Sequence, residues 1–205
     1  PDKSTSRLVL EGKPATSGDS FEAKLAMVTP KGKRLGTVTE RYTFRRDGAN
    51  LLVDTAITVS ADAGQPLRFG DTDDGGFAFR LSDDFRQDRG ALLVNSEGQA
   101  GTEQIWGKPA KWVDYTAAVN GTSAGVAILD HPSNLRHPTR WHARAYSLNA
   151  ANPFALGSFT RDKKNDGSYT LPAGQRLRLR YLVVIHDGEL PRERIEQYST
   201  RFARQ

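Results

Sequence analysis

The sequence predicts an all-β protein, an antiparallel β-sandwich with one short helix near its C-terminal end. Three observations support this fold class. Apolar residues recur with a period of two in most segments, clusters of Gly, Pro, Asn and Asp separate those segments, and helical periodicity occurs only in the last one. Many short strands joined by turns favour an antiparallel sandwich over alternating strands and helices. No repeat or linker divides the 205 residues, so we expect a single β-sandwich domain over residues 1–205.

A β-hairpin is the clearest element of the N-terminal half. Val38, Tyr42 and Phe44 share one face of a strand, a turn signal follows at residues 47–48, and residues 51–59 return as the second strand. The strands that we expect along the whole chain are residues 20–28, 36–45, 51–59, 77–81, 91–95, 111–119, 124–130, 140–146 and 177–186.

The helix is predicted over residues 190–203. Ile195, Tyr198 and Phe202 recur at helical spacing, which gives this segment one apolar face. Pro191 suits the first turn of a helix, where its missing N–H has no partner to lose.

Composition excludes several classes of protein. The chain has no cysteine, which rules out disulfides, thiolate metal sites and a cysteine nucleophile. No apolar run approaches the ~20 residues that a membrane-spanning helix needs. Lysine and arginine are scattered at a formal net charge of +5, so no nucleic-acid partner is predicted. Arg176, Arg178 and Arg180 alternate with leucines, which favours an exposed strand face over a phosphate-binding track. The sequence makes no prediction of oligomeric state.

The first candidate site is the loop and strand at residues 130–142, which holds three of the four histidines, His131, His137 and His142. The strand register places His142 between Arg140 and Arg144 on one face. Two guanidinium neighbours would disfavour the imidazolium and keep His142 neutral, the form that acts as a general base.

The alternative for His131 and His137 is that they only cap turns beside prolines. Five and then four residues separate the successive histidines, which fits no standard zinc signature. No cofactor is therefore predicted, and a metal ion is the lesser alternative.

The second candidate site is an acidic turn in which Asp71, Asp73 and Asp74 precede two glycines. Such carboxylates can bind calcium, accept hydrogen bonds from sugar hydroxyls or serve as acid and base. The alternative is an ordinary Asp/Gly turn before a strand. Arg80 alternates away from the apolar residues of that strand, so it is expected to face the same surface as the turn.

The third candidate site combines Asn95 and Glu97 with Trp106 and Lys108. A tryptophan beside polar groups suits a sugar platform, because its face stacks on the C–H face of a pyranose. Trp112 and Tyr115, a few residues further on, fit the core of a strand instead.

These motifs resemble the bacterial family of uncharacterised proteins labelled "methane oxygenase PmoA". The resemblance spans about residues 8–187 and rests on residues 70–80, 95–98, 106–114, 125–134 and 136–142. The label describes an integral membrane subunit, whereas no segment of this sequence can span a bilayer.

The resemblance implies a β-sandwich related to the galactose-mutarotase-like supersandwich. Family members accompany sugar oxidoreductases and glycoside-degrading proteins in polysaccharide-using bacteria, and many carry export signals. The resemblance therefore implies a carbohydrate ligand and a periplasmic or secreted location. Family members also carry a preceding Asp-His-Pro-His-His-like motif that is absent before Leu8. If that motif belongs to the site, this chain has lost it or is a fragment.

Two functions remain open. The leading hypothesis is a glycoside hydrolase or lyase in which His142 or His137 is the acid/base and Asp71, Asp73 or Glu97 is its carboxylate partner. The alternative is a non-catalytic carbohydrate-binding module. A purely structural sandwich would instead scatter these motifs over unconnected surfaces. The deciding observation is whether Asp71 or Asp73 lies within a substrate's width of a histidine. The residues expected to bind substrate are Arg80, Asn95, Glu97, Trp106, Lys108, His131, Asn134, Arg136 and Arg140.

Overall fold

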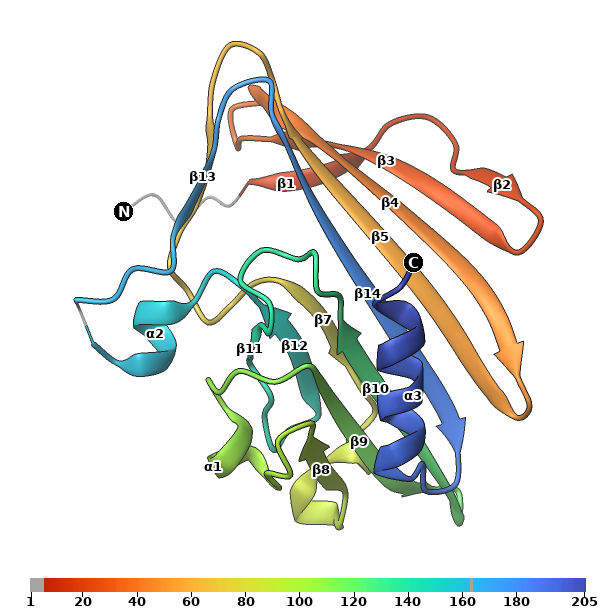
Figure 1. Ribbon diagram of the computed structural model, residues 1–205. Coiled ribbons are helices and arrows are strands. Elements are labelled where there is room, and N and C mark those ends of the chain that lie inside the picture. Colours follow the sequence, from red (N-terminus) through yellow and green to blue (C-terminus); the bar gives the residue numbers. More distant parts are fainter. Residues whose placement is uncertain (1–5, 163) are drawn as a thin grey trace.

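One large antiparallel sheet organises the computed structural model, which describes residues 6–162 and 164–205 (Figure 1). In spatial order its strands are β1 (Arg7–Leu10), β3 (Ser20–Val28), β4 (Arg34–Asp47), β5 (Asn50–Ala61), β14 (Arg176–Asp187), β10 (Thr122–Asp130), β9 (Trp112–Val119) and β8 (Leu92–Asn95), with β2 (Ala15–Ser17) paired to β3.

A three-stranded sheet of β11 (Arg140–Trp141), β12 (Leu148–Asn152) and β7 (Phe77–Arg80) forms the second layer. A separate pair joins β6 (Leu67–Phe69) to β13 (Tyr169–Leu171). The helices are α1 (Thr102–Ile105), α2 (Leu156–Thr160) and α3 (Arg192–Phe202), and two short 3-10 turns cover Asp83–Phe85 and Gln87–Arg89. The predicted all-β, antiparallel sandwich with a short C-terminal helix is confirmed.

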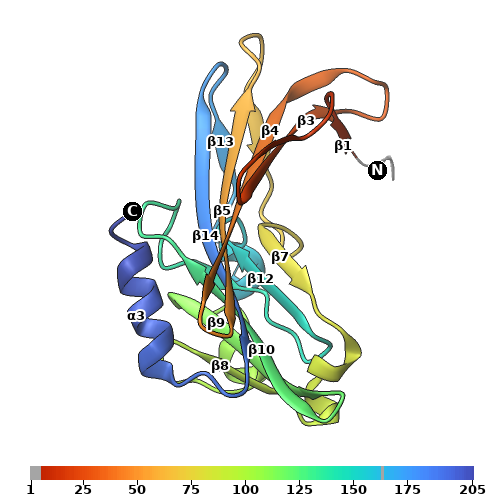
Figure 2. The ribbon, with the colours of Figure 1, turned by 90° about the vertical axis from the view of Figure 1, so that its right-hand side faces the viewer.

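Strand β14 contributes apolar side chains to two hydrophobic cores, one on each face of the large sheet. Its residues Tyr181 and Val183 belong to the core between the large and the three-stranded sheets, whereas Leu182 and Val184 belong to the core beneath α3. Successive side chains of a strand point to opposite faces, so a continuous apolar run marks a strand that is covered on both sides. Figure 2 shows α3 and the β7–β12 layer on opposite sides of the large sheet.

Helix α3 packs through the three residues that its spacing predicted. Ile195, Tyr198 and Phe202 are each 1% exposed and contact the large sheet. No helix in the described part of the chain is both long and apolar enough to cross a membrane.

The hairpin of β4 and β5 extends past the second layer, and this position changes the environment of its apolar face. Val38 is buried in the core, but Phe44 on the same face is 37% exposed and stacks on Phe21 instead. Figure 1 shows that β1 to β5 extend beyond the three-stranded sheet, so the apolar face continues beyond the core.

The strand predicted at residues 140–146 is wrong in length. Strand β11 ends at Trp141, and a bridge from Arg144 to Leu148 closes a tight connection to β12, a strand that was not predicted. Ser147 lies in this connection with a φ of 69° and turns the chain back. The turn lacks Gly, Pro and Asn at its centre, so the usual turn signal was missing.

Candidate functional site

The outer face of the three-stranded sheet gathers several of the predicted residues. Trp141, Ala151 and Phe77 lie in one cross-strand row and face the core between the sheets. The alternate residues must therefore face outward, and His142 continues the outward series on the strand that begins with Arg140. This face is where β7, β11 and β12 bring residues from three parts of the chain together.

His142 has a fixed orientation on this face. Its side chain is only 5% exposed, and its Nδ1 lies 2.6 Å from the backbone oxygen of Asp73. A carbonyl oxygen can only accept, so Nδ1 must carry the proton that it donates. In the neutral imidazole, Nε2 therefore holds the free lone pair.

The carboxylate of Asp73 lies beside that lone pair. Its Oδ2 is 3.9 Å from Nε2 of His142, and its side chain is 41% exposed. The backbone of Asp73 is held in turn, because Nδ2 of Asn152 donates to the carbonyl oxygens of Thr72 and Asp73 at 2.9 and 3.1 Å. One buried imidazole and one solvent-accessible carboxylate thus form what we call the His142–Asp73 pair.

Arginine and aromatic side chains alternate along the same region. The guanidinium carbon of Arg80 is 4.6 Å from the ring centroid of Tyr146, and that of Arg144 is 5.5 Å from the same centroid. Arg144 also lies 6.0 Å from the ring centroid of Trp106, and Arg161 lies 5.5 Å from it. Distances of this size are those of cation–π contacts. We call these five residues the arginine–aromatic row.

Trp106 connects the row to the His142–Asp73 pair. Its ring makes edge-to-face contacts with Phe159 at 5.3 Å and with His142 at 6.5 Å between centroids. Its Nε1 is buried and has no hydrogen-bond partner among the described residues. Two guanidinium groups lie over the ring, so Trp106 holds cations rather than offering a bare platform for a sugar.

Asp71 has a different environment from Asp73, although the sequence offered both as catalytic candidates. Its carboxylate accepts hydrogen bonds from the backbone N–H groups of Gly157, Ser158 and Gly167 and from the Ser158 hydroxyl, at 2.5 to 2.9 Å. Burial acts to raise the pKa of Asp71, but the three backbone donors together hold it below its usual value. Asp71 therefore anchors α2 and is left out of the acid–base assignment.

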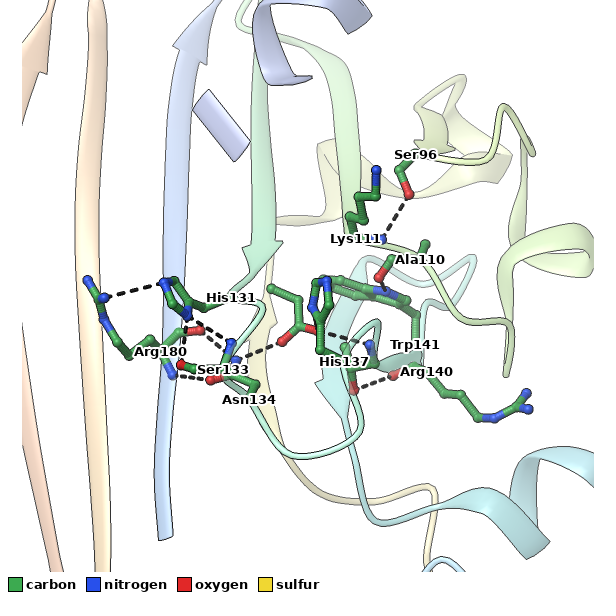
Figure 3. A network of polar contacts seen from close by, with 12 residues as sticks. Ser96, Ala110, Lys111, His131, Ser133, Asn134, His137, Arg140, Trp141 and Arg180 are labelled. Atoms are coloured by element: carbon green, nitrogen blue, oxygen red, sulfur yellow. Dashed lines mark hydrogen bonds and ion pairs between the residues drawn. The ribbon is translucent and has the colours of Figure 1, made fainter. Parts of the chain in front are cut away.

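The loop after β10, which carries His131, Asn134 and His137 in Figure 3, is organised by the hydrogen bonds of Asp130. The fully buried carboxylate of Asp130 lies 2.8 Å from Nδ1 of His137 and accepts from the Thr139 N–H at 2.9 Å and from Nδ2 of Asn134 at 2.7 Å. His137 is 19% exposed and lies well apart from His131 in Figure 3. The contacts bridge the loop across seven and nine residues, so this second His–carboxylate pair fixes the loop conformation.

His131 lies at the other end of that loop, against β14. The backbone N–H of Ser133 donates to its Nδ1 at 3.1 Å, and Arg180 lies 3.4 Å from its Nε2. Burial first, and the Arg180 guanidinium second, hold the pKa of His131 below its ordinary value. Asn134 ties the loop to the strand, because its amide exchanges two hydrogen bonds with the backbone of Arg180.

The remaining predicted residues make contacts that do not include His142 or Asp73. Arg136 donates to the carbonyl oxygens of Pro153, Gly167 and Ser168, and Arg140 donates to that of Gly107 at 2.6 Å. Asn95 is 1% exposed and accepts from two backbone N–H groups of its own turn, one of them that of Glu97. Lys108 is exposed, and its side chain makes no hydrogen bond or ion pair with the other described residues.

The predicted motifs therefore divide into two groups. His142, Asp73 and Trp106 lie together on the outer face and Arg80 is linked to Trp106 through Tyr146 and Arg144, whereas Asp71, Arg136, Asn134 and Asn95 hold loops in place. Sequence reasoning missed Tyr146 and Arg161 as members of the site. Arg144 was placed beside His142 by its alternation with Arg140, but it was not counted among the substrate-binding residues. Arg161 follows α2, and no local pattern relates it to Trp106.

The alternating arginines of β14 form an exposed strand face, as predicted. Arg176 and Arg178 are exposed while Leu177 and Leu179 are buried. With Arg41 from β4, among others, they line a groove of about 1000 Å³ that does not include the His142–Asp73 pair. In residues 6–162 and 164–205, no three His, Asp or Glu side chains cluster closely enough to hold a metal ion.

Comparison with known proteins adds a family but no activity. A family model described as a family of unknown function (DUF6807) matches residues 4–200. No curated protein matches the sequence. The chemistry of the site must therefore be argued from its own residues.

Proposed function

This chain belongs to the family of unknown function DUF6807, and from its residues we propose that it is a carbohydrate-active enzyme, a glycoside hydrolase or lyase. The observation that carries the proposal is the His142–Asp73 pair, with Nε2 3.9 Å from Oδ2. An imidazole whose Nε2 can accept a proton, close to a solvent-accessible carboxylate, is suited to moving a proton at a bound substrate. Carbohydrate as substrate remains the expectation from the sequence resemblance.

His142 is the proton acceptor in this proposal. Nε2 takes a proton from the substrate or from a water held against it, while Nδ1 stays bonded to the Asp73 carbonyl. The imidazolium that forms lies about 4 Å from the Asp73 carboxylate, a separation at which opposite charges attract by about 1–4 kcal/mol between bulk water and a protein surface. His142 then returns the proton to the leaving oxygen.

The alternative is a non-catalytic carbohydrate-binding module. Asp71 favours it, because the carboxylate that could have served as a second acid or base is engaged by three donors of α2 and by the N–H of Gly167. Hydrolases generally use two carboxyl groups across the scissile bond. The two readings differ in one respect, which is whether a bound glycan is converted.

The test is a turnover screen over polysaccharides and oligosaccharides, read as reducing-end release for hydrolysis and as new ultraviolet absorbance for elimination. We expect His142→Gln and Asp73→Asn to lower kcat by about 100-fold on whichever glycan is converted. Asp74→Asn is the matched control, because Asp74 is exposed next to Asp73 and lines a cavity that includes neither Asp73 nor His142. Thermal unfolding of each variant checks that the fold is intact.

If His142→Gln and Asp73→Asn both turn over the glycan as fast as the wild-type protein, the acid–base assignment is refuted. Binding of a glycan without conversion by the wild-type protein would replace the enzyme with the binding module.

A further inference from the structure

The arginine–aromatic row concentrates positive charge that the described residues do not neutralise. Arg80, Arg144 and Arg161 form no ion pair with any carboxylate in the described ranges. By contrast, Arg86 and Arg194 each lie within 2.9 Å of an aspartate oxygen. Three guanidinium groups that form no ion pair therefore gather around two rings, and they outnumber the Asp73 carboxylate of the neighbouring pair.

The rings hold these guanidinium groups in defined places. Arg144 lies between Tyr146 and Trp106, at 5.5 and 6.0 Å from their centroids. A guanidinium that stacks on an aromatic face keeps its N–H groups free at its edge, and the ordering reduces the entropy lost on binding an anion. The row is thus arranged to receive an acidic group.

We infer that the site takes an acidic glycan, with a carboxylate or sulfate group of the sugar on the arginine–aromatic row. This inference rests on the proposed function, because it names the substrate class of the same site. Trp106 joins the row to His142 across 6.5 Å between ring centroids, so an anion bound to the row would lie on a sugar whose bonds reach the His142–Asp73 pair. The planar fork of arginine matches the two oxygens of a carboxylate.

Single-stranded nucleic acid is the competing polyanion, because arginines and aromatic rings also bind it. Base stacking needs free aromatic faces. Trp106 and Tyr146 each already have two guanidinium groups within 6.0 Å of their centroids. The row therefore fits an anion on a non-aromatic ring better than a stacked base.

The experiment measures binding by calorimetry rather than turnover. The probes are short oligouronates and their carboxyl-reduced counterparts, a sulfated oligosaccharide and its desulfated form, and a single-stranded oligonucleotide. We expect an acidic form to bind at least tenfold more tightly than its neutral counterpart, with an affinity that falls as salt rises. The oligouronate and sulfate arms identify which anion is recognised.

Arg80→Gln and Arg161→Gln test the row, because both side chains are exposed and their replacement leaves the core intact. Each is expected to weaken binding of the acidic form about tenfold and to leave the neutral form unchanged. Arg204→Gln removes the same charge at an exposed position near the C-terminus and should have no effect.

Equal binding of acidic and neutral forms, absence of binding by every acidic glycan, or equal weakening by Arg204→Gln would overturn the inference. Tighter binding of the oligonucleotide would overturn it as well. Selective binding without conversion would leave this inference standing and refute the enzymatic function. Conversion of a neutral glycan alone would support the enzymatic function and refute the acidic substrate.

Discussion

Replacing Asp71 with asparagine should destabilise the protein, whereas the same change at Asp73 should not. Each oxygen of Asp71 accepts two hydrogen bonds, Oδ1 from the N–H and hydroxyl of Ser158 and Oδ2 from the N–H groups of Gly157 and Gly167. An asparagine NH₂ group in either orientation faces at least one backbone donor. Only the Ser158 hydroxyl can turn to accept from it.

The size of the expected destabilisation follows from the number of hydrogen bonds that Asp71 accepts. Hydrogen bonds to a charged group contribute about 1.5–3 kcal/mol each, and neutral ones about 0.5–1.5 kcal/mol. Asp71→Asn loses at least one bond outright and weakens the others. Since Asp71 is partly exposed, water replaces some of the loss, and we expect the free energy of unfolding to fall by about 3 kcal/mol. Asp73→Asn, at a side chain that is 41% exposed, should change it by less than about 0.5 kcal/mol.

Urea unfolding followed by tryptophan fluorescence measures both variants. The pKa of Asp71 is lowered on folding, so its contribution to stability is present above the unfolded value near 4 and is lost as pH falls through the folded value. The difference in unfolding free energy between wild type and Asp71→Asn should therefore become smaller in acid. Equal unfolding free energies for Asp71→Asn and Asp73→Asn at neutral pH would refute the anchoring role. A loss of turnover in Asp71→Asn without a loss of stability would instead indicate that Asp71 is a catalytic residue.

Three further predictions concern the stability of the fold as a whole. Burial is the largest single influence on the pKa of His186 and acts to lower it, but the hydrogen bond and charge of Asp114, with smaller contributions from the Gly188 carbonyl and Asp187, together raise it. The unfolding free energy should therefore decline as pH rises through the folded pKa, above 6.5; Asp114→Asn should reduce that decline in urea titrations at pH 6 to 9, and an unchanged slope contradicts the pairing. Gly76→Ala should cost about 2–4 kcal/mol, because φ is +83° and a Cβ would overlap the carbonyl of Ala151; a stability within about 0.5 kcal/mol of wild type argues against this strain. Phe202→Ala should cost about 3–5 kcal/mol in the same assay, since Phe202 is the last residue of α3 and is 1% exposed against the large sheet, and a smaller effect means that α3 adds little to the second core.

The strands and their buried faces could be predicted because they depend on neighbouring residues. Alternation within β5, β9 and β14 located each strand to within about two residues, and the spacing of Ile195, Tyr198 and Phe202 located α3. Phe44 shows the limit of this reasoning. Its position on an apolar face was predicted, but its exposure depends on how far the second layer extends, which no local pattern encodes.

The candidate site shows the same division. Its residue types were visible as motifs, but Asp71 and Asp73 could not be distinguished from each other. Their environments are set by partners 69 to 96 positions away in the sequence. Asp73 meets His142, whereas Asp71 meets Gly157, Ser158 and Gly167. Chain folding alone decides which carboxylate meets a helix and which meets an imidazole.

By itself the sequence determined the fold class, the strand faces and the set of chemical groups that the protein displays, because side-chain periodicity follows from the geometry of the local backbone. Only the tertiary structure decided that His142 faces Asp73, that Asp71 is an anchor, and that Arg80, Arg144 and Arg161 share one surface. Those contacts join separate loops across a sheet, and their distances depend on how the layers pack rather than on spacing along the chain.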